Sequence, residues 1–423
     1  MKKFKVIIIG GGAAGCAAAL KLKEASVETA ILEAGDRLLK KLLVTGNGRC
    51  NITNDKLIKP NDVTPFFTCH DPSFDFLPLF EQDASKAIEF FADLGLPLTT
   101  LDQGKMYPKS LQASSVSDLI RLRLNELEVP IFLKERVKTI SFSQDGFSLH
   151  TQTNHFQADF ILIAVGGQAM PGTGSDGSLN KVIRGLGHRM ISPLPALVQL
   201  KTDFPQLRAL AGVKADAHLT LLDGQQVIRE ETGELLFTDY GVSGPPVLQL
   251  SRFASVLLSE HKQPTLIIDL FPELSPVEVL SLILRQRDRF PQRETQFLLN
   301  GIVRKKLIPV LLRQSGLDKM NRPAGEIDLS IYENLSQMLT NWQMTITDTN
   351  GFANSQSTLG GVDLSEINPQ TMASKKANHL FFAGEVLDVC GASGGYNLQW
   401  AWSSAFAAAE AIINQINPTK NTH

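Results

Sequence analysis

The sequence predicts an α/β fold whose core is a parallel sheet built from both ends of the chain. The stretch KVIIIG (residues 5–10) is a β-branched run typical of a buried parallel strand, and an Ala-rich helical segment follows it. Near the other end, HLFFAGE (379–385) gives a second apolar strand, followed by a glycine-rich loop and a long amphipathic helix. At 423 residues with 43% apolar content, the chain can form two or three domains.

A glycine turn joins the first strand to the first helix. Gly10, Gly12 and Gly15 have the spacing G-x-G-x-x-G: one glycine makes the tight turn, one lets the backbone approach a pyrophosphate, and one lets the helix pack on the strand. The helix N-terminus then offers free N–H groups to phosphates. A second strand ends at Glu33, whose carboxylate can accept hydrogen bonds from ribose hydroxyls. Together these features predict a Rossmann-like domain that binds NAD or FAD.

The middle of the chain divides into further parts. Residues 130–167 form a run of strands that resembles a β-meander and ends in ILIAVGG, where two glycines allow close approach of backbone. Residues 192–273 contain short strands and turns, which indicate an inserted β-barrel-like domain. A capping box at Ser275 with Pro276 at the first helical position begins an inserted helical subdomain, 274–342. The dinucleotide domain is therefore expected to be discontinuous, with residues 1–191 and 343–423.

Six motifs in order span nearly the whole chain: KKLLVTGNGRCNITN, GKMYPKSLQASSV, LIAVGGQAMPGTGSDG, GELLFTDYGVSGPPVL, TLGGVDLSEINPQTM and FFAGEVLDVCGASGGYNLQ. They resemble the successive motifs of the BaiN-like, or aminoacetone-oxidase-like, flavoproteins, which have an FAD domain of the glutathione-reductase type. The resemblance implies FAD as the cofactor. It also implies that the T-G-N-G-R-C-N loop lies against the flavin and that Gly384 and Glu385 lie beside the ribityl chain. Family members often have Asp in place of Cys390 and His in place of Asp239.

The predicted cofactor-binding residues come from these motifs: Gly10, Gly12, Ala13, Ala14, Gly15, Glu33, Ala34, Lys41, Thr45, Gly46, Asn47, Gly48, Arg49, Cys50, Asn51, Val137, Ala164, Val165, Gly166, Gly167, Gly384, Glu385, Gly395, Tyr396, Asn397 and Leu398. The last four begin the final helix, whose dipole can stabilise negative charge on reduced flavin. The catalytic group is unknown, with candidates Glu385, Asp388, Tyr396 and Asp239.

Two residues of the opening loop have alternative interpretations. Arg49 either supplies a positive charge near the flavin or forms a salt bridge that holds the loop. Cys50 has no resolving cysteine nearby in the sequence, so we interpret it as a structural cysteine and not as part of a disulfide relay.

Composition narrows the classes of partner. A formal charge of −2, with 41 basic and 43 acidic residues, gives no general attraction for nucleic acid or anionic membranes. We interpret the basic run at Arg304–Lys306 as a solvated helix face. No uninterrupted run of eighteen apolar residues predicts a membrane span. Four cysteines without a C-x-x-C pair favour a reducing, cytoplasmic location, and no metal site is predicted.

The predicted function is an FAD-dependent oxidoreductase that transfers hydride between a small organic substrate, or NAD(P)H, and flavin N5. The GTGSDG segment (172–177) is interpreted as a loop of the flavin domain, so NAD(P)H would dock only transiently as an electron donor. The resembled family is linked to amine oxidation and to reduction of unsaturated steroid-like substrates, and neither activity transfers by fold alone. Two alternatives stay open: a flavin-dependent RNA-modifying enzyme, which the near-neutral charge disfavours, and a non-catalytic flavin-binding redox protein. The oligomeric state is not predicted.

Overall fold

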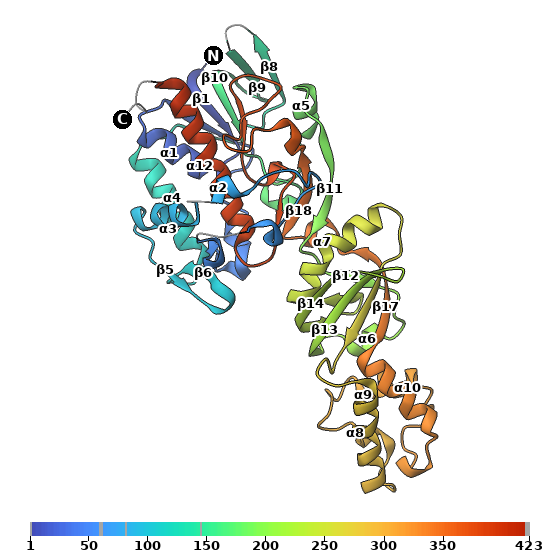
Figure 1. Ribbon diagram of the computed structural model, residues 1–423. Helices are drawn as coiled ribbons and strands as arrows, with labels where there is room; N and C mark the ends of the chain where they lie inside the picture. The colour runs from blue at the N-terminus through green and yellow to red at the C-terminus, as the bar shows by residue number, and fades with distance from the viewer. Residues whose placement is uncertain (1, 59–61, 81–82, 144–145, 419–423) are drawn as a thin grey trace. The chain divides into compact units, whose positions relative to one another are not determined.

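The chain divides into two compact units, Met1–Pro195 with Ser355–His423, and Ala196–Asn354 (Figure 1). The computed structural model describes residues 2–58, 62–80, 83–143 and 146–418. Unit 1 contains both chain ends, which confirms the discontinuous domain. The boundary expected at residue 343 differs from this division, because that residue lies in β17 (Trp342–Thr349), a strand that pairs with strands of unit 2. The expected β-domain and helical subdomain also fall together in unit 2.

A seven-stranded sheet forms the core of unit 1. In this sheet, β1 pairs in parallel with β2 and with β10. The pairs β2–β7 and β10–β19 are also parallel. The antiparallel strands β8 and β9 extend it as the predicted meander. Ile8 of β1 lies opposite Ile31 and Leu162 and is fully buried, as a strand covered on both faces requires. The strands are β1 (Lys2–Ile9), β2 (Thr29–Glu33), β7 (Ile131–Leu133), β8 (Thr139–Ser143), β9 (Gly146–His150), β10 (His155–Ile163) and β19 (Leu380–Phe382).

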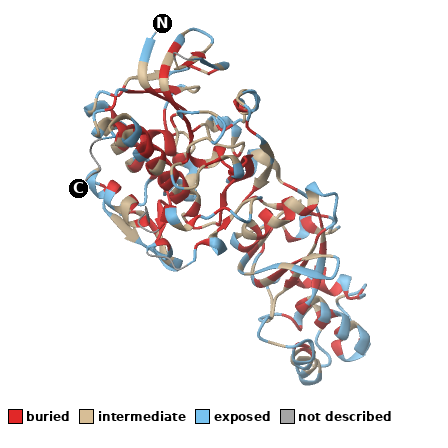
Figure 2. Cartoon of the chain, turned by 45° about the horizontal axis from the view of Figure 1, so that its top comes forward, coloured by how far each residue is buried: buried red, intermediate tan, exposed pale blue. Residues whose placement is uncertain are grey.

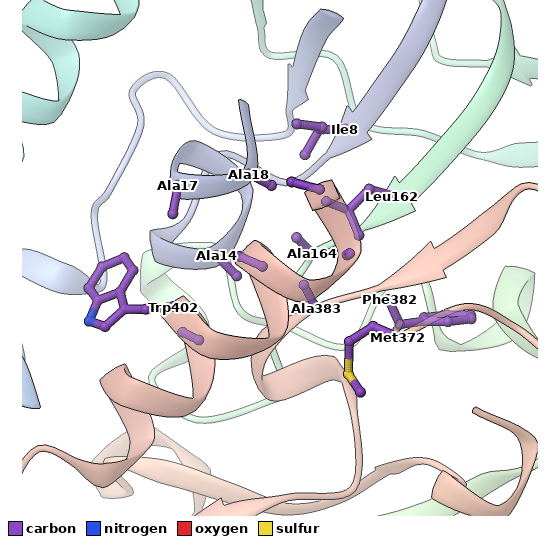
Figure 3. Close-up of a cluster of buried hydrophobic side chains, with 14 of the residues drawn as sticks. Ile8, Ala14, Ala17, Ala18, Leu162, Ala164, Met372, Phe382, Ala383 and Trp402 are labelled. Atoms are coloured by element: carbon purple, nitrogen blue, oxygen red, sulfur yellow. The ribbon is translucent and has the colours of Figure 1, made fainter. Parts of the chain in front are cut away.

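Two helices from opposite ends of the chain pack together in this unit. They are α1 (Ala13–Glu24) and α12 (Tyr396–Ile416). Ala14, Ala17 and Ala18 of α1 belong to one buried cluster with Ala383 and Trp402, and their small side chains allow close approach (Figure 3). Buried residues concentrate in the central strands and these helices (Figure 2). The other α-helices described in unit 1 are α2 (Leu77–Phe80), α3 (Asp83–Asp93), α4 (Ala113–Glu126) and α5 (Asn180–Gly185).

Three small sheets hold distant segments of unit 1 side by side. In one of them β20 pairs antiparallel with β4, which fixes the start of the glycine-rich loop before α12. The strands of these sheets are β3 (Thr53–Asn54), β5 (Leu98–Thr100) and β6 (Lys105–Pro108); β4 (Phe67–Thr68) and β20 (Cys390–Gly391); β11 (Met190–Ala196) and β18 (Ser357–Val362).

Unit 2 contains a closed six-stranded barrel with helices. The predicted β-barrel-like insertion is therefore confirmed, and its apolar residues share one core with those of the helices. The capping box of α8 is present: the Ser275 hydroxyl accepts from the Glu278 N–H, and the Glu278 carboxylate accepts from the Ser275 N–H. Besides β17, the strands and helices are β12 (Leu200–Thr202), β13 (Lys214–Asp223), β14 (Gln226–Phe237), β15 (Gly241–Ser243), β16 (Thr265–Asp269), α6 (Leu207–Leu210), α7 (Pro245–Ser259), α8 (Pro276–Arg289), α9 (Ile308–Gln314), α10 (Leu329–Thr340) and α11 (Gly351–Asn354).

Among the residues described, none of the helices combines the length and the apolar composition that crossing a membrane would require.

Candidate functional site

The three glycines of the first turn have different surroundings. A Cβ atom on Gly15 would lie 1.9 Å from the carbonyl oxygen of Gly10, so this glycine is required for helix α1 to pack on the turn. Gly10 has φ +108°, and a Cβ there would lie 2.4 Å from the carbonyl oxygen of Ala164. A Cβ on Gly12, in contrast, would meet no atom within 4 Å. Gly12 therefore faces open space, where the G-x-G-x-x-G pattern requires room for a pyrophosphate.

Two adjoining cavities lie at this turn, within unit 1. The larger encloses about 990 Å³ of space, part of it open to solvent, and the smaller about 450 Å³. They share the walls Gly10, Glu33, Val165 and Gly174. The predicted cofactor-binding residues that line one or both are Gly10, Gly12, Ala13, Ala14, Glu33, Ala34, Lys41, Thr45, Val137, Ala164, Val165, Gly166, Gly384, Glu385, Asn397 and Leu398.

Glu33 lies at the end of β2, where both cavities meet. One carboxylate oxygen accepts from the Gly11 N–H at 2.7 Å, and the other accepts from the Gly35 N–H at 2.6 Å. These bonds fix the side chain. A carboxylate offers about four lone-pair positions, so two remain for hydroxyl donors. The geometry therefore fits the predicted contact with a ribose.

Cations and an unpaired hydroxyl also line the larger cavity. Arg37, Lys40 and Lys41 are lining residues. Lys40 is paired with Asp36, and Lys41 with Glu385. Arg37 and the N-terminus of α1 are therefore the groups that can balance the negative charge of a pyrophosphate. The Ser175 hydroxyl is buried and has no hydrogen-bond partner among the described residues. Because leaving such a group unsatisfied costs about 1–3 kcal/mol, a polar ligand atom in the cavity would stabilise it. The open space at Gly12, the Arg37 cation and this hydroxyl all fit FAD.

Glu385 lines the larger cavity but is held by three donors. Its carboxylate accepts from Lys41 Nζ at 2.5 Å, from the Thr358 N–H at 2.9 Å and from the Gly167 N–H at 3.4 Å. It therefore joins three segments of the cavity wall. Of the four catalytic candidates, it is the one that lines either of these two cavities.

The other three catalytic candidates lie elsewhere. Tyr396 stacks on Phe66 with ring centroids 4.6 Å apart, and burial raises the pKa of its hydroxyl to about 12. Asp388 is buried and accepts hydrogen bonds from the backbone N–H groups of His70 and Gly360. Asp239 is exposed and belongs to unit 2, whereas the cavities belong to unit 1. These positions favour structural contacts for Tyr396 and Asp388.

The start of α12 borders the larger cavity through Asn397 and Leu398. The Asn397 side chain accepts from the Gly391 N–H and the Ser357 hydroxyl, both at 2.9 Å, and donates to the Gly391 carbonyl at 2.8 Å. It therefore holds the glycine-rich loop in place. Gly395 has φ +100°, and a Cβ there would lie 2.3 Å from the Thr53 carbonyl oxygen. The glycine is thus required for the loop to pass close to β3.

The T-G-N-G-R-C-N loop contributes one residue to the cavity, Thr45. Residues 46–49 are exposed, and Arg49 neither lines a cavity nor forms an ion pair with a described residue. Cys50 is buried, and burial raises its thiol pKa to about 12, as a structural cysteine would have. Predicted residues outside both walls are Gly15, Gly46, Asn47, Gly48, Arg49, Cys50, Asn51, Gly167, Gly395 and Tyr396.

Sequence reasoning missed several lining residues. The basic ones follow Glu33 in the stretch EAGDRLLKK, so a search for cations just after the ribose-binding acid would have found Arg37 and Lys40. Ser175 lies in the GTGSDG loop, and Trp400 lines the cavity only because α12 packs beside the glycine turn. The missed residues of the larger cavity are Gly11, Arg37, Leu39, Lys40, Leu42, Thr173, Gly174, Ser175, Gln356, Ser357, Ala383, Val389, Trp400 and Ala401.

The contact between His70 and Asp388 gives a pH-dependent prediction. The Asp388 carboxylate, 3.0 Å from the His70 ring, raises the pKa of that ring above its ordinary value. The interaction is therefore fully present below about pH 6.5 and is lost as pH rises through the raised pKa. We expect His70→Gln to destabilise the chain more at about pH 6 than at about pH 8 in urea unfolding. An equal loss at both pH values would contradict this.

The fold and the cavity define a Rossmann-type domain that fits FAD. A reductase that is 39% identical over 97% of the chain supports an FAD-dependent oxidoreductase. The chain belongs to the family described as "HI0933-like protein Rossmann domain", whose model matches residues 4–411.

Similar proteins cover nearly the whole chain. A 3-dehydro-bile acid delta(4,6)-reductase of Clostridium scindens is 39% identical and covers 97% of this chain and 99% of its own. A ribosomal RNA dihydrouridine synthase of Haemophilus influenzae is 30% identical and covers 97% of this chain and 98% of its own. Among solved structures, a 3-ketosteroid-delta4-(5alpha)-dehydrogenase of Rhodococcus jostii RHA1 has a TM-score of 0.51 at 15% identity, with 97% of each chain covered. This structural similarity supports the Rossmann-type fold assigned to the chain.

Proposed function

We propose that this chain is a reductase that adds hydrogen across a carbon–carbon double bond conjugated to a carbonyl group. One observation carries the proposal: two relatives that each match nearly the whole chain have names that describe this same change. A delta(4,6)-reductase of a 3-dehydro bile acid saturates double bonds conjugated to the 3-oxo group. A dihydrouridine synthase saturates the ring double bond of uridine, which is conjugated to a carbonyl.

Bound FAD would supply the chemistry, by accepting hydride from a donor and passing hydride to the substrate at flavin N5. The chain's own residues bind and orient. The N-terminus of α12, a helix of 21 residues, borders the cavity with the positive end of its dipole. A helix dipole stabilises negative charge at that end by about 0.3–2 kcal/mol. Leu398, Val389 and Trp400 give the wall an apolar part that excludes water.

The pair Lys41–Glu385 is the group we assign to hold an exchangeable proton at the cavity wall. Lys41 Nζ lies 2.5 Å from a Glu385 oxygen, and both side chains are mostly buried, with 23% and 19% of the side chain exposed. The three donors around Glu385 keep the carboxylate in place, so the ammonium is the movable member. Saturating a double bond needs one proton in addition to hydride, and Lys41 Nζ is a donor with access to the cavity.

We further propose that NAD(P)H is a transient electron donor. Segment 172–177 contributes Thr173, Gly174, Ser175, Asp176 and Gly177 to the two cavities, which supports its interpretation as a loop of the flavin domain. A second dinucleotide site is therefore not assigned to this segment.

A uridine in RNA is the second candidate substrate. It is favoured by two relatives named as ribosomal RNA dihydrouridine synthases, of Haemophilus influenzae and Escherichia coli, which are 30% and 29% identical over 97% and 98% of this chain. The higher identity of the bile acid reductase, 39%, favours a steroid-like enone instead.

Anaerobic photoreduction followed by rapid mixing tests the proposed function. We expect a 3-oxo-Δ4 steroid to reoxidise the reduced holoprotein at least about tenfold faster than the matching saturated ketone does. Alternatively, we expect a uridine-containing transcript to do so at least about tenfold faster than a transcript in which dihydrouridine replaces uridine. Absorbance of the flavin reports the rate. Reoxidation by oxygen alone would contradict the proposal and indicate an oxidase. No reoxidation by any of these would indicate a non-catalytic flavin-binding protein.

A further inference from the structure

A strongly basic stretch lies in unit 2, in residues 285–322, which we call the basic segment. It contains ten basic and three acidic residues, so its formal charge is +7 although the whole chain has −2. The remainder of the chain therefore has a formal charge of −9. The basic residues are Arg285, Arg287, Arg289, Arg293, Arg304, Lys305, Lys306, Arg313, Lys319 and Arg322, and the acidic ones are Asp288, Glu294 and Asp318.

Most of this charge is exposed and not neutralised. All the basic residues except Arg287 are exposed. Arg287 is also the one member that forms an ion pair within this fully described stretch, with Asp288 at 2.7 Å. The positive charges therefore face solvent without acidic partners, which gives a local positive potential that the net charge of the chain conceals.

Only part of the basic segment has a structural explanation. Arg289 lies in the last turn of α8, where a cation favours the helix dipole, and the Arg293 guanidinium lies 3.7 Å from the centroid of the Phe290 ring. Arg304–Lys306, however, lie in a turn just before α9, not on the helix face that the sequence suggested. Cations are unfavourable at that end of a helix. Helix stability therefore gives no reason for these three cations.

The fold brings two parts of the basic segment together, and an exposed aromatic residue follows one of them in the sequence. The Thr295 N–H donates to the Arg322 carbonyl, and the Ala324 N–H donates to the Arg293 carbonyl, both at 2.9 Å. Phe297, which follows this contact, is an exposed large apolar residue with 47% of its surface accessible. Exposed aromatic rings among cations are the combination that single-stranded RNA binds, by stacking and by phosphate contacts.

We propose that the basic segment binds the phosphate backbone of RNA, with Phe297 stacking on a base. The inference rests on the second candidate substrate of the proposed reductase, uridine in RNA. It adds a location in unit 2 for RNA binding. The uncompensated positive charge, the three cations at an unfavourable helix end and the exposed ring support it independently of the relatives.

Charge reversal at Arg304, Lys305 and Lys306 tests this proposal. We expect R304E/K305E/K306E holoprotein to bind a fluorescein-labelled ribosomal RNA transcript at least about tenfold more weakly in fluorescence anisotropy. The slope of log affinity against log salt should fall by about 2 to 3. Because Glu favours the N-terminal end of α9, the variant should stay folded. The matched control K3E/K109E/K181E changes the charge equally at exposed residues of unit 1.

Phe297→Ala is a second variant, which leaves the charge unchanged. We expect it to lower the affinity for the RNA transcript by about fivefold or more. Equal RNA affinity of the charge-reversed chain and its control would overturn the inference. So would wild-type binding to phosphatidylglycerol vesicles in place of RNA. If the wild type binds no RNA while its reduced flavin is still reoxidised by the steroid enone, the inference fails and the proposed reductase stands. If RNA binds at the segment but no unsaturated substrate reoxidises the flavin, the reductase fails and the binding surface stands.

Discussion

Replacing Gly12 with Asp is expected to weaken FAD binding by about a thousandfold while the chain still folds. The backbone at Gly12 has φ −81° and ψ −167°, which any residue can adopt, and a Cβ there meets no atom within 4 Å. The new carboxylate would enter the open space at the N-terminus of α1, where we place the pyrophosphate. Two like unit charges about 4 Å apart repel by about 4 kcal/mol at an effective dielectric constant of about 20. That energy corresponds to about a thousandfold loss of affinity.

The control for charge is Gly12→Ala, which adds a methyl group without charge. We expect it to weaken FAD binding far less than Gly12→Asp, with the apoprotein melting temperature of both variants close to that of the wild type. Calorimetric titration with FAD and thermal melting of the apoprotein provide the two measurements. If the Gly12→Asp variant bound FAD as tightly as the wild type, the cofactor would have to lie elsewhere.

Replacing Gly15 with Ala is expected to destabilise unit 1 by about 3 kcal/mol. The added Cβ would lie 1.9 Å from the Gly10 carbonyl oxygen and 3.2 Å from Ile8 Cγ2. Both the turn and the first strand are fully packed, so α1 must move away from the sheet and lose contacts with α12. Urea unfolding followed by circular dichroism measures the loss.

Gly12→Ala is also the matched control for this variant, since the same chemical change occurs three residues earlier in the same motif. We expect it to change the free energy of unfolding by less than about 0.5 kcal/mol. Equal stability of the two alanine variants would contradict the close contact between α1 and the glycine turn. It would leave the assignment of the cavity to FAD untouched, because Gly15 does not line either cavity.

The sequence predicted the architecture of unit 1 because each step depends on local pattern. Val and Ile runs mark β1 and β10, the glycines mark the turn, and Glu33 marks the end of β2. The boundary of unit 2 was harder to place. Strand β17 follows the helices along the chain yet closes the barrel by pairing with β12 and β16, and such a pairing between distant segments leaves no local signal.

The candidate site was predictable where backbone conformation dictates the residue type. Gly10 and Gly384 both have positive φ, and the sequence showed both. Placing the catalytic candidates relative to the cavity required coordinates. Tyr396 begins the same helix as the lining residues Asn397 and Leu398, but its ring stacks on Phe66 instead of lining the cavity. The net charge also concealed a local feature, because the total of −2 for the chain includes +7 within 285–322.

The central claim is that FAD binds in unit 1 with its pyrophosphate at the glycine turn. Titration of the apoprotein with FAD, compared between the wild type and Gly12→Asp, tests this claim most directly. The account predicts one FAD bound per wild-type chain, with the visible absorbance of protein-bound flavin, and binding by Gly12→Asp that is weaker by about a thousandfold. A wild-type chain that stays colourless after incubation with FAD would contradict it.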